Sequence, residues 1–327
     1  MKARFLPYLV CVECKSNLKL TVSEKRGEEI EEGKLSCLCG REYPVINGIP
    51  RMLPRELAKE KTKTASAFGK KWREFAEMHM HHEAQFLDWI WPITKKFFRN
   101  KLVLDAGCGQ GRHVYFAAQY GAKAVLGIDL SEAVDVAHQH TRKFPNVCIV
   151  QGDIYHLPFK EKLFDYAFSI GVLHHLPDPE RGFDAILEHV KPGGTFSAWV
   201  YGSQGLLVKV FNTTRKHVLA RLPMPVNYGL SLLTTAVLYP VVKLVYNPLS
   251  KLTPALAKRL PQQQFFVYLG KLGFRMTHEI IYDQFIAPTA VYYTGAEFKR
   301  WFKKAKIRSF SVTERNQNSW RGTATRK

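Results

Sequence analysis

The residues with the clearest chemical meaning lie within 103–113, where an acid is followed by three glycines at alternate positions. The acid is Asp105, and the glycines are Gly107, Gly109 and Gly111. A strand that turns tightly into a helix needs backbone with positive φ and no Cβ between it and a ligand, which glycine provides. The first turn of the helix also presents unpaired backbone N–H groups to that ligand. The spacing therefore predicts a small-molecule site at this turn.

Two pairs of cysteines near the start of the chain suit a metal ion. Cys11 and Cys14 form a C-x-x-C pair, and Cys37 and Cys39 form a C-x-C pair. Four thiolates in two such turns match tetrahedral Zn²⁺, and a unit as small as residues 1–54 buries too little core to fold without such help. The second pair is one residue shorter than C-x-x-C, so plain buried thiols are the alternative. We predict that these four cysteines bind zinc.

These residues must be positioned by regular elements, and residues 101–202 alternate short apolar runs with segments of helical character. The expected second strand ends in Asp129, and the third is followed by Asp153 within QGDIYHLPF. Alternating strands and helices build a parallel sheet with both faces covered. Ligands then lie beyond the carboxyl ends of the strands, where an acid after the second strand hydrogen-bonds ribose hydroxyls. Asp129 stands at that position.

The D-x-G-x-G-x-G turn, the acid at 129, GVLHHLPDP and the KPGG turn together resemble class I S-adenosylmethionine (SAM) methyltransferases. Within them the chain is similar to the type 11 group, which includes the ubiquinone and menaquinone methyltransferases. The resemblance implies SAM as cofactor and an α/β fold with a doubly wound, mostly parallel, seven-stranded Rossmann-like sheet whose last strand is antiparallel. The residues that it assigns to SAM binding are Asp105, Gly107, Gly109, Gly111, Asp129, Leu130, Asp153 and Ile154.

The rest of the chain divides around this core. Residues 1–54, which end in GREYPVINGIPRMLP, resemble the zinc-ribbon domain related to the small activator subunit of tRNA and release-factor methyltransferases. Residues 55–100 are expected to be a basic linker and an N-terminal helix, in which SAFGKKW resembles a segment that closes over the cofactor. Residues 101–327 are expected to form the methyltransferase domain, with a helical insertion at 203–293.

The sequence after the expected fourth strand restricts the chemistry. It reads SIGVLHHL, without the N/D-P-P-Y turn typical of enzymes that methylate exocyclic amines of bases and without the cysteine that C5 methylation of cytosine needs. His174 and His175 are candidates for a general base, because imidazole titrates near neutral pH. The alternative is that they cap the turn or line the SAM pocket. Many methyl transfers need no strong base, since the sulfonium supplies the driving force and the protein mainly aligns donor and acceptor.

Charge is the strongest compositional feature. The net charge of +20 and the pI near 9.7 indicate a polyanionic partner such as nucleic acid, anionic lipid or a phosphorylated substrate, unless the whole proteome is basic. From His189 to His278 there is no Asp or Glu, and eleven residues are Lys or Arg. Within this span residues 229–246 carry a single charge, but Pro240 interrupts them and they fall short of the about 20 apolar residues of a spanning helix. We expect a lid over the core, an anchor in the plane of an anionic membrane, or a segment that does both.

The insertion ends in YDQFIAPTAVYY, similar to a loop that approaches the acceptor in ribbon-fused methyltransferases. This likeness makes Tyr282, Asp283, Tyr292 and Tyr293 candidate acceptor contacts. Our main expectation is methyl transfer to oxygen or carbon of a lipophilic or lipid-linked small molecule, in the cytoplasm or peripherally on the inner face of the membrane. The alternatives are an RNA (rRNA or tRNA) methyltransferase and a non-catalytic SAM-binding adaptor.

Overall fold

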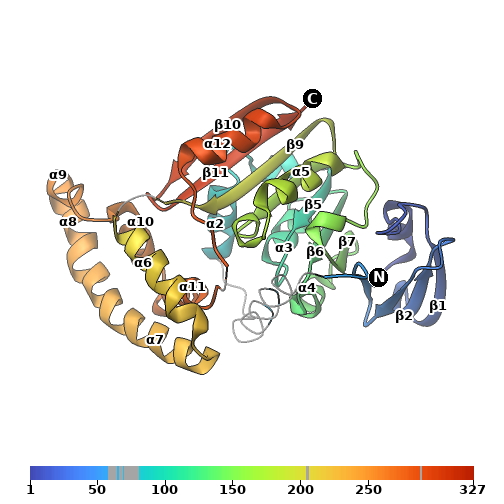
Figure 1. Cartoon of the computed structure of the whole chain (residues 1–327), viewed down its shortest axis with the longest axis horizontal. Coiled ribbons are helices and arrows are strands. Elements are labelled where there is room, and N and C mark those ends of the chain that lie inside the picture. Colours follow the sequence, from blue (N-terminus) through green and yellow to red (C-terminus); the bar gives the residue numbers. More distant parts are fainter. Residues whose placement is uncertain (58–64, 66–68, 70–80, 204–205, 288) are drawn as a thin grey trace.

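The chain forms a central β-sheet with helices on both faces, a cysteine-containing unit at one end and a helical insertion at the other (Figure 1). The computed structural model describes residues 1–327 except 58–64, 66–68, 70–80, 204–205 and 288, and for residues 81, 206 and 207 it describes only the backbone. The predicted linker segment SAFGKKW, residues 66–72, therefore lies outside the described residues apart from Gly69.

The centre of the sheet consists of strands that are buried on both faces. β5 (Leu102–Ala106) is buried along its whole length, and its side chains alternate between two hydrophobic clusters on opposite faces. The order is β7-β6-β5-β8-β9-β11-β10, in which β11 alone runs in the opposite direction to the other strands. The other strands are β6 (Ala124–Asp129), β7 (Val147–Gly152), β8 (Phe164–Ile170), β9 (Val190–Tyr201), β10 (Ile307–Arg315) and β11 (Ser319–Arg326).

Four N-terminal strands continue this sheet: β1 (Lys19–Arg26), β2 (Glu29–Ser36), β3 (Glu42–Ile46) and β4 (Ile49–Met52). They form an antiparallel ladder, and β4 then pairs in parallel with β7 through Arg51 opposite Gln151. Over the described part of the chain the sheet is therefore mixed and has eleven strands, so the predicted count of seven was wrong for the sheet as a whole. The reason is that β7 would otherwise be an open edge with unpaired backbone groups, and β4 covers it.

The two faces of the sheet carry different helices. On one face, α5 (Pro179–His189) and α12 (Gly295–Lys304) pack through Phe183 and Trp301. On the other face lie α2 (His81–Trp89), α3 (Arg112–Gln119) and α4 (Ala133–Thr141). This arrangement confirms the predicted Rossmann-like α/β architecture. Short 3-10 helices lie at η1 (Ala3–Tyr8), η2 (Lys95–Phe98), η3 (Ile154–His156), η4 (Leu173–His175) and η5 (Leu219–Arg221).

Residues between β9 and α12 add a helical body beside the sheet (Figure 1). Its helices are α6 (Leu206–His217), α7 (Met224–Val241), the π-helix η6 (Val242–Tyr246), α8 (Asn247–Leu252), α9 (Pro254–Ala257), α10 (Gln263–Gly270) and α11 (Phe274–Ile286). The helix Met224–Leu252 runs for 29 residues with a mean hydropathy of 1.5 in its most apolar window, of which 17% is buried. By length and composition alone it is long enough to cross a membrane, a test that core helices of soluble proteins also pass.

The expectation that Pro240 interrupts this apolar segment was wrong. Pro240 lies inside α7, and the chain continues through η6 into α8 without leaving helical geometry. Proline removes one backbone donor and crowds the preceding turn, and a π-turn is a common way to accommodate such a disturbance.

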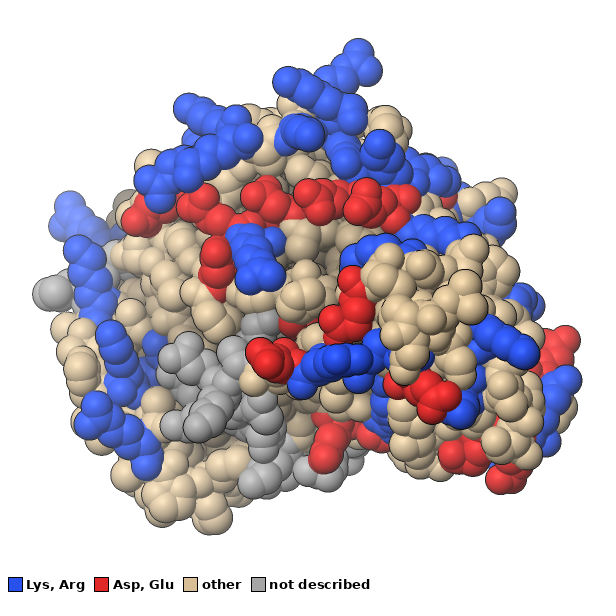
Figure 2. Space-filling view, turned by 45° about the vertical axis from the view of Figure 1, so that its right-hand side comes forward, with Lys and Arg blue, Asp and Glu red and all other residues tan. Residues whose placement is uncertain are grey.

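Charge is unevenly spread over the surface. Figure 2 shows a band of Asp and Glu side chains with Lys and Arg side chains on both sides of it. On this face the basic side chains are therefore separated by acids and do not form one continuous basic surface.

Candidate active site

The glycine-rich turn after β5 has the backbone that its sequence requires. Gly107, Gly109 and Gly111 have φ values of 90°, 49° and 82°. A Cβ on Gly107 would lie 2.3 Å from a methyl carbon of Val172, and one on Gly111 would lie 3.0 Å from Ala137. Each glycine thus meets a conformational demand, and two of them also allow a close approach that a side chain would block.

Two of the predicted acids follow the ends of neighbouring strands. The Asp129 carboxylate, at the end of β6, accepts hydrogen bonds from the Gly109 N–H at 2.9 Å and from the Ser131 N–H and hydroxyl at 2.8 and 2.7 Å. It therefore ties the end of β6 to the glycine turn. Asp153, directly after β7, is buried and accepts from the Tyr155 N–H at 3.2 Å. Both carboxylates are held in place by backbone donors before any ligand is considered.

Two polar side chains at this turn are buried without a hydrogen-bond partner among the described residues. Asp105 is completely buried, and neither carboxylate oxygen is paired. Burial raises the pKa of Asp105 well above its ordinary value, and the nearby Asp129 carboxylate raises it further. Gln110 is 1% exposed, and both polar atoms of its amide lack a partner. Buried polar groups are normally paired, so the Gln110 amide, which lines the neighbouring cavity, leaves hydrogen-bonding capacity for a ligand.

A cavity opens at the carboxyl ends of the strands. Six of the eight residues predicted to bind SAM line it, and Asp105 and Gly111 lie behind the wall. The six are Gly107, Gly109, Asp129, Leu130, Asp153 and Ile154. Gln110 also lines the cavity. The structure thus brings one turn and two strand ends together around one space.

The far end of the cavity is built by segments distant from the glycine turn. They are α2, β9, the insertion helices α10 and α11, and the hairpin of β10 and β11. Their lining residues are Gln85, Trp89, Trp199, Tyr201, Phe265, Tyr268, Met276, Glu279, Ile280, Asp283, Gln284, Arg315 and Asn318. Of these, sequence reasoning named Asp283 alone, because no single motif contains the others.

Ion pairs and hydrogen bonds join these distant segments. Arg112, the first residue of α3, lies 3.3 Å from the Glu279 carboxylate on α11, and both side chains are mostly buried. Asp88, in α2, receives the guanidinium groups of Arg315 and Arg321 from the terminal hairpin. The far end of the cavity is therefore cross-linked to the core by charge.

The two candidate catalytic histidines differ in position. His174 is completely buried, does not line the cavity, and has its ring centroid 3.9 Å from that of Tyr201. Burial lowers the pKa of His174 well below its ordinary value, and His175 and Arg215 lower it further, so the ring is neutral. His175 lines the cavity, and its Nδ1 is paired with the Thr289 carbonyl. A carbonyl only accepts, so this nitrogen of His175 carries a proton.

The four candidate acceptor contacts do not lie together. Asp283 lines the cavity and accepts a 2.9 Å hydrogen bond from the Tyr201 hydroxyl. Tyr292 lies one layer behind, with its ring centroid 5.3 Å from that of Tyr201, and burial raises its pKa to about 12. Tyr282 is completely buried within the insertion, and Tyr293 packs on Trp301 on the other side of the sheet edge.

A buried arginine holds the loop that carries Tyr292. The Arg215 guanidinium, 2% exposed, donates to the carbonyl oxygens of Ala287 at 2.6 Å and of Ala290 at 3.0 Å. The same loop pairs with the histidine turn, because the Val291 N–H donates to the His174 carbonyl at 2.9 Å. The end of the insertion and the turn after β8 therefore form one supported wall, which the sequence pattern did not predict.

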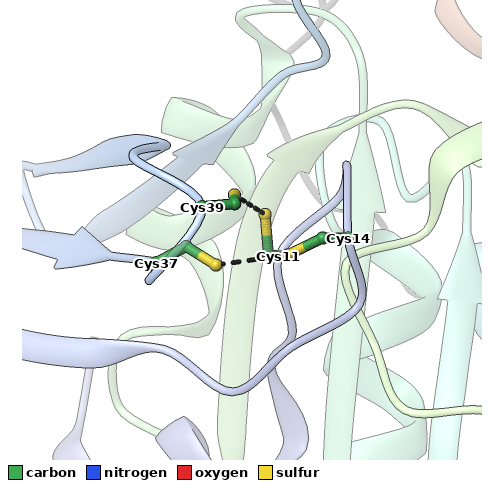
Figure 3. A group of neighbouring side chains, drawn as sticks. All are labelled: Cys11, Cys14, Cys37 and Cys39. Atoms are coloured by element: carbon green, nitrogen blue, oxygen red, sulfur yellow. Dashed lines mark hydrogen bonds between the residues drawn. The ribbon is translucent and has the colours of Figure 1, made fainter.

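The four N-terminal cysteines converge as predicted (Figure 3). Their sulfur atoms all lie within 4.8 Å of one another, with Cys11 and Cys39 at 3.7 Å and Cys14 and Cys37 at 3.3 Å. Zinc bonds to sulfur of about 2.3 Å place tetrahedral sulfur atoms about 3.8 Å apart, which this cluster fits. The shortened second pair closes because Gly40 follows it with a φ of 83°. The four thiols could therefore hold a zinc ion.

Comparison with known proteins adds to this geometry. Residues 104–198 match a protein family described as "Methyltransferase domain". A methyltransferase-like protein of Encephalitozoon cuniculi is 30% identical over 148 residues, which are 43% of this chain and 62% of that protein. The tRNA U34 carboxymethyltransferase of Pseudoalteromonas atlantica is 33% identical over 113 residues, covering 33% of this chain and 35% of the relative. The 24-methylenesterol C-methyltransferase 3 of Arabidopsis thaliana is 33% identical over 122 residues, 36% and 33% of the two chains.

The chain spans less than two thirds of the length of each of these relatives. Among solved structures, a complex between the Haloferax volcanii Trm112 methyltransferase activator and a second protein gives a TM-score of 0.46 at 14% identity, over 83% of this chain and 99% of that one. The likeness to these three relatives covers at most 148 residues. The family match falls on the part that contains the glycine turn, Asp129 and Asp153.

Proposed function

We propose that this chain, whose residues 104–198 form a SAM-dependent methyltransferase domain, transfers a methyl group from SAM to an acceptor held at the far end of the cavity. The observation that carries the proposal is the shape of the cavity. One continuous space joins the predicted SAM residues to the aromatic and apolar residues of β9, α10 and α11. Donor and acceptor can therefore occupy one continuous site.

The residues at the glycine turn fit SAM. Asp129 and Asp153 present carboxylate oxygens to the cavity for hydroxyl and amino groups, and the unpaired Gln110 amide lines the same wall. When bound, SAM supplies a methyl group on a positively charged sulfur, which leaves as a neutral thioether. The role of this chain is to bind SAM and the acceptor, to orient them and to exclude water, since alignment alone lowers a methyl-transfer barrier substantially.

The residues at the far end of the cavity are better suited to position the acceptor than to act as a strong base. Burial raises the pKa of Tyr201 well above its ordinary value, and its hydroxyl donates to Asp283. His174 is neutral and lies behind the wall. The carboxylate of Asp283 and the imidazole of His175 both line the cavity, and each is a wall group placed to take up a proton from an acceptor hydroxyl or an acidic carbon.

The lining at this end favours a lipophilic acceptor that is methylated on oxygen or carbon. Phe265, Met276 and Ile280 contribute apolar surface, and Trp89 and Trp199 contribute rings whose indole N–H groups have no partner among the described residues. Such a wall binds a largely apolar molecule with a few polar groups. The sterol methyltransferase among the relatives acts on a molecule of that type.

RNA is the second candidate acceptor, and the named relatives support it better than a lipophilic molecule. Several of them are tRNA U34 carboxymethyltransferases at about 30% identity. The net charge of +20 also suits phosphate binding. The similarity is confined to part of each protein, so the choice of acceptor depends on experiment. A third candidate, a SAM-binding adaptor without turnover, would bind SAM and transfer no methyl group.

For the N-terminal unit we propose a zinc ribbon. Its support is the convergence of the four cysteines and their place at the edge of the methyltransferase sheet. A cytoplasmic setting is part of the proposal, because all six cysteines are free of disulfide bonds and zinc binding needs reduced thiols.

The first test addresses SAM binding. Asp129→Ala removes an acceptor from the cavity and is expected to weaken SAM affinity at least about tenfold, or 1.4 kcal/mol, by titration calorimetry. Asp184→Ala, an exposed acid of the same domain, is the matched control. Thermal melting verifies that both variants are folded. Unchanged affinity in Asp129→Ala would refute the assignment of the SAM site.

The second test identifies the acceptor. The protein is incubated with SAM labelled on its methyl group and either RNA or a solvent extract of cellular lipids. Label that becomes soluble in organic solvent and resists nuclease supports the lipophilic acceptor. Nuclease-sensitive label supports RNA instead, and SAM binding without transfer to either pool supports the adaptor.

A further inference from the structure

The helix formed by α7, η6 and α8 buries a polar side and exposes an apolar one, the reverse of an ordinary surface helix. Asn227, Ser231 and Thr235, which are spaced one turn apart, are small polar residues, and they are buried. The exposed side chains at helical spacing are large and apolar, and we call them the apolar stripe: Val226, Leu230, Leu233, Val237, Val241 and Leu244. A helix on a soluble protein normally turns its apolar stripe toward the core. Because the apolar stripe faces away from the core, we expect another molecule or a lipid surface to cover it.

The inward polar side is specifically bound, so the helix cannot simply rotate. The Asn227 amide donates to the Leu219 carbonyl at 2.8 Å, and the Ser231 hydroxyl pairs with Nε2 of His278 on α11 at 2.9 Å. Turning the apolar stripe inward would break these buried hydrogen bonds. The orientation seen is thus the one that the neighbouring helix requires.

The exposure of the apolar stripe is substantial. Leu233, Val237 and Leu244 are 62%, 64% and 75% exposed. The helix runs for 29 residues along the outer side of the insertion, at the opposite end of the molecule from the cysteine unit (Figure 1). An apolar surface of this length on a protein marks a contact with another molecule or with lipid.

The charges around the apolar stripe identify that cover as an anionic surface. No Asp or Glu occurs between His189 and His278. Exposed basic residues stand at both ends of the helix: Arg221 before α7, and Lys251, Lys258 and Arg259 around α8 and α9. Basic residues flanking an apolar helix face are drawn to anionic headgroups while the apolar side chains enter the interface.

Two other covers fit these observations less well. A second copy of the chain would bring the same acid-free, basic helical body against itself, and like charges oppose such a contact. RNA would satisfy the basic residues but would leave the apolar stripe in water, since its backbone is polyanionic. A bilayer satisfies both the stripe and the charges.

We propose that the helix 224–252 docks in the plane of an anionic lipid bilayer, with the apolar stripe in the interfacial region. The docking is in-plane because the inner side of the helix stays bound to α11, so lipid cannot surround it. This inference goes beyond the proposed methyl transfer and does not depend on it.

The test is flotation of nuclease-treated full-length protein with phosphatidylcholine vesicles, with and without phosphatidylglycerol. The wild type is expected to float with the anionic vesicles. Leu233→Asp with Val237→Asp places two charges on the apolar stripe and is expected to reduce binding at least about tenfold. Thr21→Asp with Val22→Asp adds the same charge to exposed positions of β1 and is expected to bind as the wild type does. Unchanged SAM affinity verifies that both variants are folded.

Replacing Lys251, Lys258 and Arg259 by Gln is expected to weaken binding to the anionic vesicles and to leave the protein soluble. The proposal is overturned if the wild type does not float, or if the stripe variant floats as well as the control. Resistance to alkaline carbonate extraction would overturn in-plane docking in favour of a spanning helix. If the wild type does not bind vesicles but forms a dimer, and the variant with Leu233→Asp and Val237→Asp is a monomer, the apolar stripe is a contact with a second copy of the chain.

Discussion

Gly107 is constrained both by its own backbone and by a neighbour. Its φ of 90° disfavours any side chain, and a Cβ would lie 2.3 Å from Val172. This turn also forms part of the cavity wall. A side chain at position 107 would therefore strain the backbone and also change the shape of the ligand site.

We predict that Gly107→Ala lowers the free energy of unfolding by about 1–3 kcal/mol and weakens SAM binding. Gly193→Ala is the control, because Gly193 has a φ of 74° but a Cβ there would have no neighbour within 4 Å, so it carries the backbone strain without the contact. Adding Val172→Ala to Gly107→Ala should restore part of the loss. Equal losses in Gly107→Ala and Gly193→Ala would show that the contact is unimportant. Urea unfolding and SAM titration measure the two effects.

Buried histidines, among them His113, His174 and His189, make stability depend on pH. Burial lowers the pKa of His113, His174 and His189, with further lowering of His113 by Arg112. Because the unfolded state binds protons first as the pH falls, the stability from the neutral rings is present above a pH of about 6.5 and is lost below it. Each group contributes a slope of up to about 1.4 kcal/mol per pH unit.

We therefore predict that these histidines lower the free energy of unfolding between pH 7.5 and 5.5, against an opposite contribution from Asp105, whose raised pKa favours the folded state as the pH falls. His174→Phe should remove about 1 kcal/mol or more of the lowering. Phe keeps a ring beside Tyr201 but cannot bind a proton. His217→Phe, at an exposed position, is the control and should leave the slope unchanged. If His174→Phe leaves the slope unchanged as well, His174 is not held neutral by burial. Urea unfolding at several pH values gives the slopes.

At the scale of elements, α11 of the insertion is held on the core by charge. The Arg112 and Glu279 side chains are 14% and 10% exposed, and their atoms lie 3.3 Å apart. Removing one partner leaves the other charge largely buried, which is costly. This pair also lines the cavity, so it links the position of the insertion to the start of α3.

A double-mutant cycle of Arg112→Gln and Glu279→Gln should give a coupling energy of about 1–3 kcal/mol in urea unfolding. The control is the Lys304 and Glu180 pair at 3.0 Å, whose side chains are 61% and 37% exposed. Exposed pairs contribute about 0–1 kcal/mol. A coupling energy no larger than that of the control would mean that α11 is held by packing alone.

At the scale of the whole molecule, the cysteine unit and the SAM site share one sheet. β4 pairs with β7, and Asp153 follows β7 directly. The Arg51 guanidinium adds hydrogen bonds to Asp135 of α4 at 2.6 Å and to Gln151 at 3.2 Å. Met1, Phe5 and Leu9 also belong to the same hydrophobic cluster as β5. The N-terminal unit is therefore part of the core rather than a tethered domain.

We predict about one zinc ion per chain by elemental analysis, and its loss in Cys14→Ser with Cys37→Ser. That loss should lower the thermal midpoint and weaken SAM affinity, because β4 no longer supports β7 beside Asp153. Thr21→Ala, exposed on β1, is the control. Loss of zinc with unchanged SAM affinity would show that the metal site and the SAM site are independent.

The sequence by itself determined the parts of this protein that local rules govern. A strand, a turn of three glycines and a helix are contiguous, and the positive φ values at Gly107, Gly109 and Gly111 follow from residue type. The placement of Asp129 and Asp153 at one edge of the sheet was predictable because parallel strands bring their carboxyl ends together, whereas the role of Asp153 in SAM binding came from the family resemblance. The cysteine spacing likewise indicated that four thiols converge.

Tertiary structure alone decided the far wall of the cavity, the junction of β4 with β7 and the outward direction of the apolar stripe. The wall joins α2, β9, α11 and the terminal hairpin, which are separated by long stretches of chain, so no sequence window contains it. β4 is short, and nothing in its composition names β7 as its partner. The stripe faces outward because Ser231 meets its hydrogen-bond partner, Nε2 of His278, only after α7 and α11 have packed. Each outcome depends on which surfaces meet, and that depends on the whole chain.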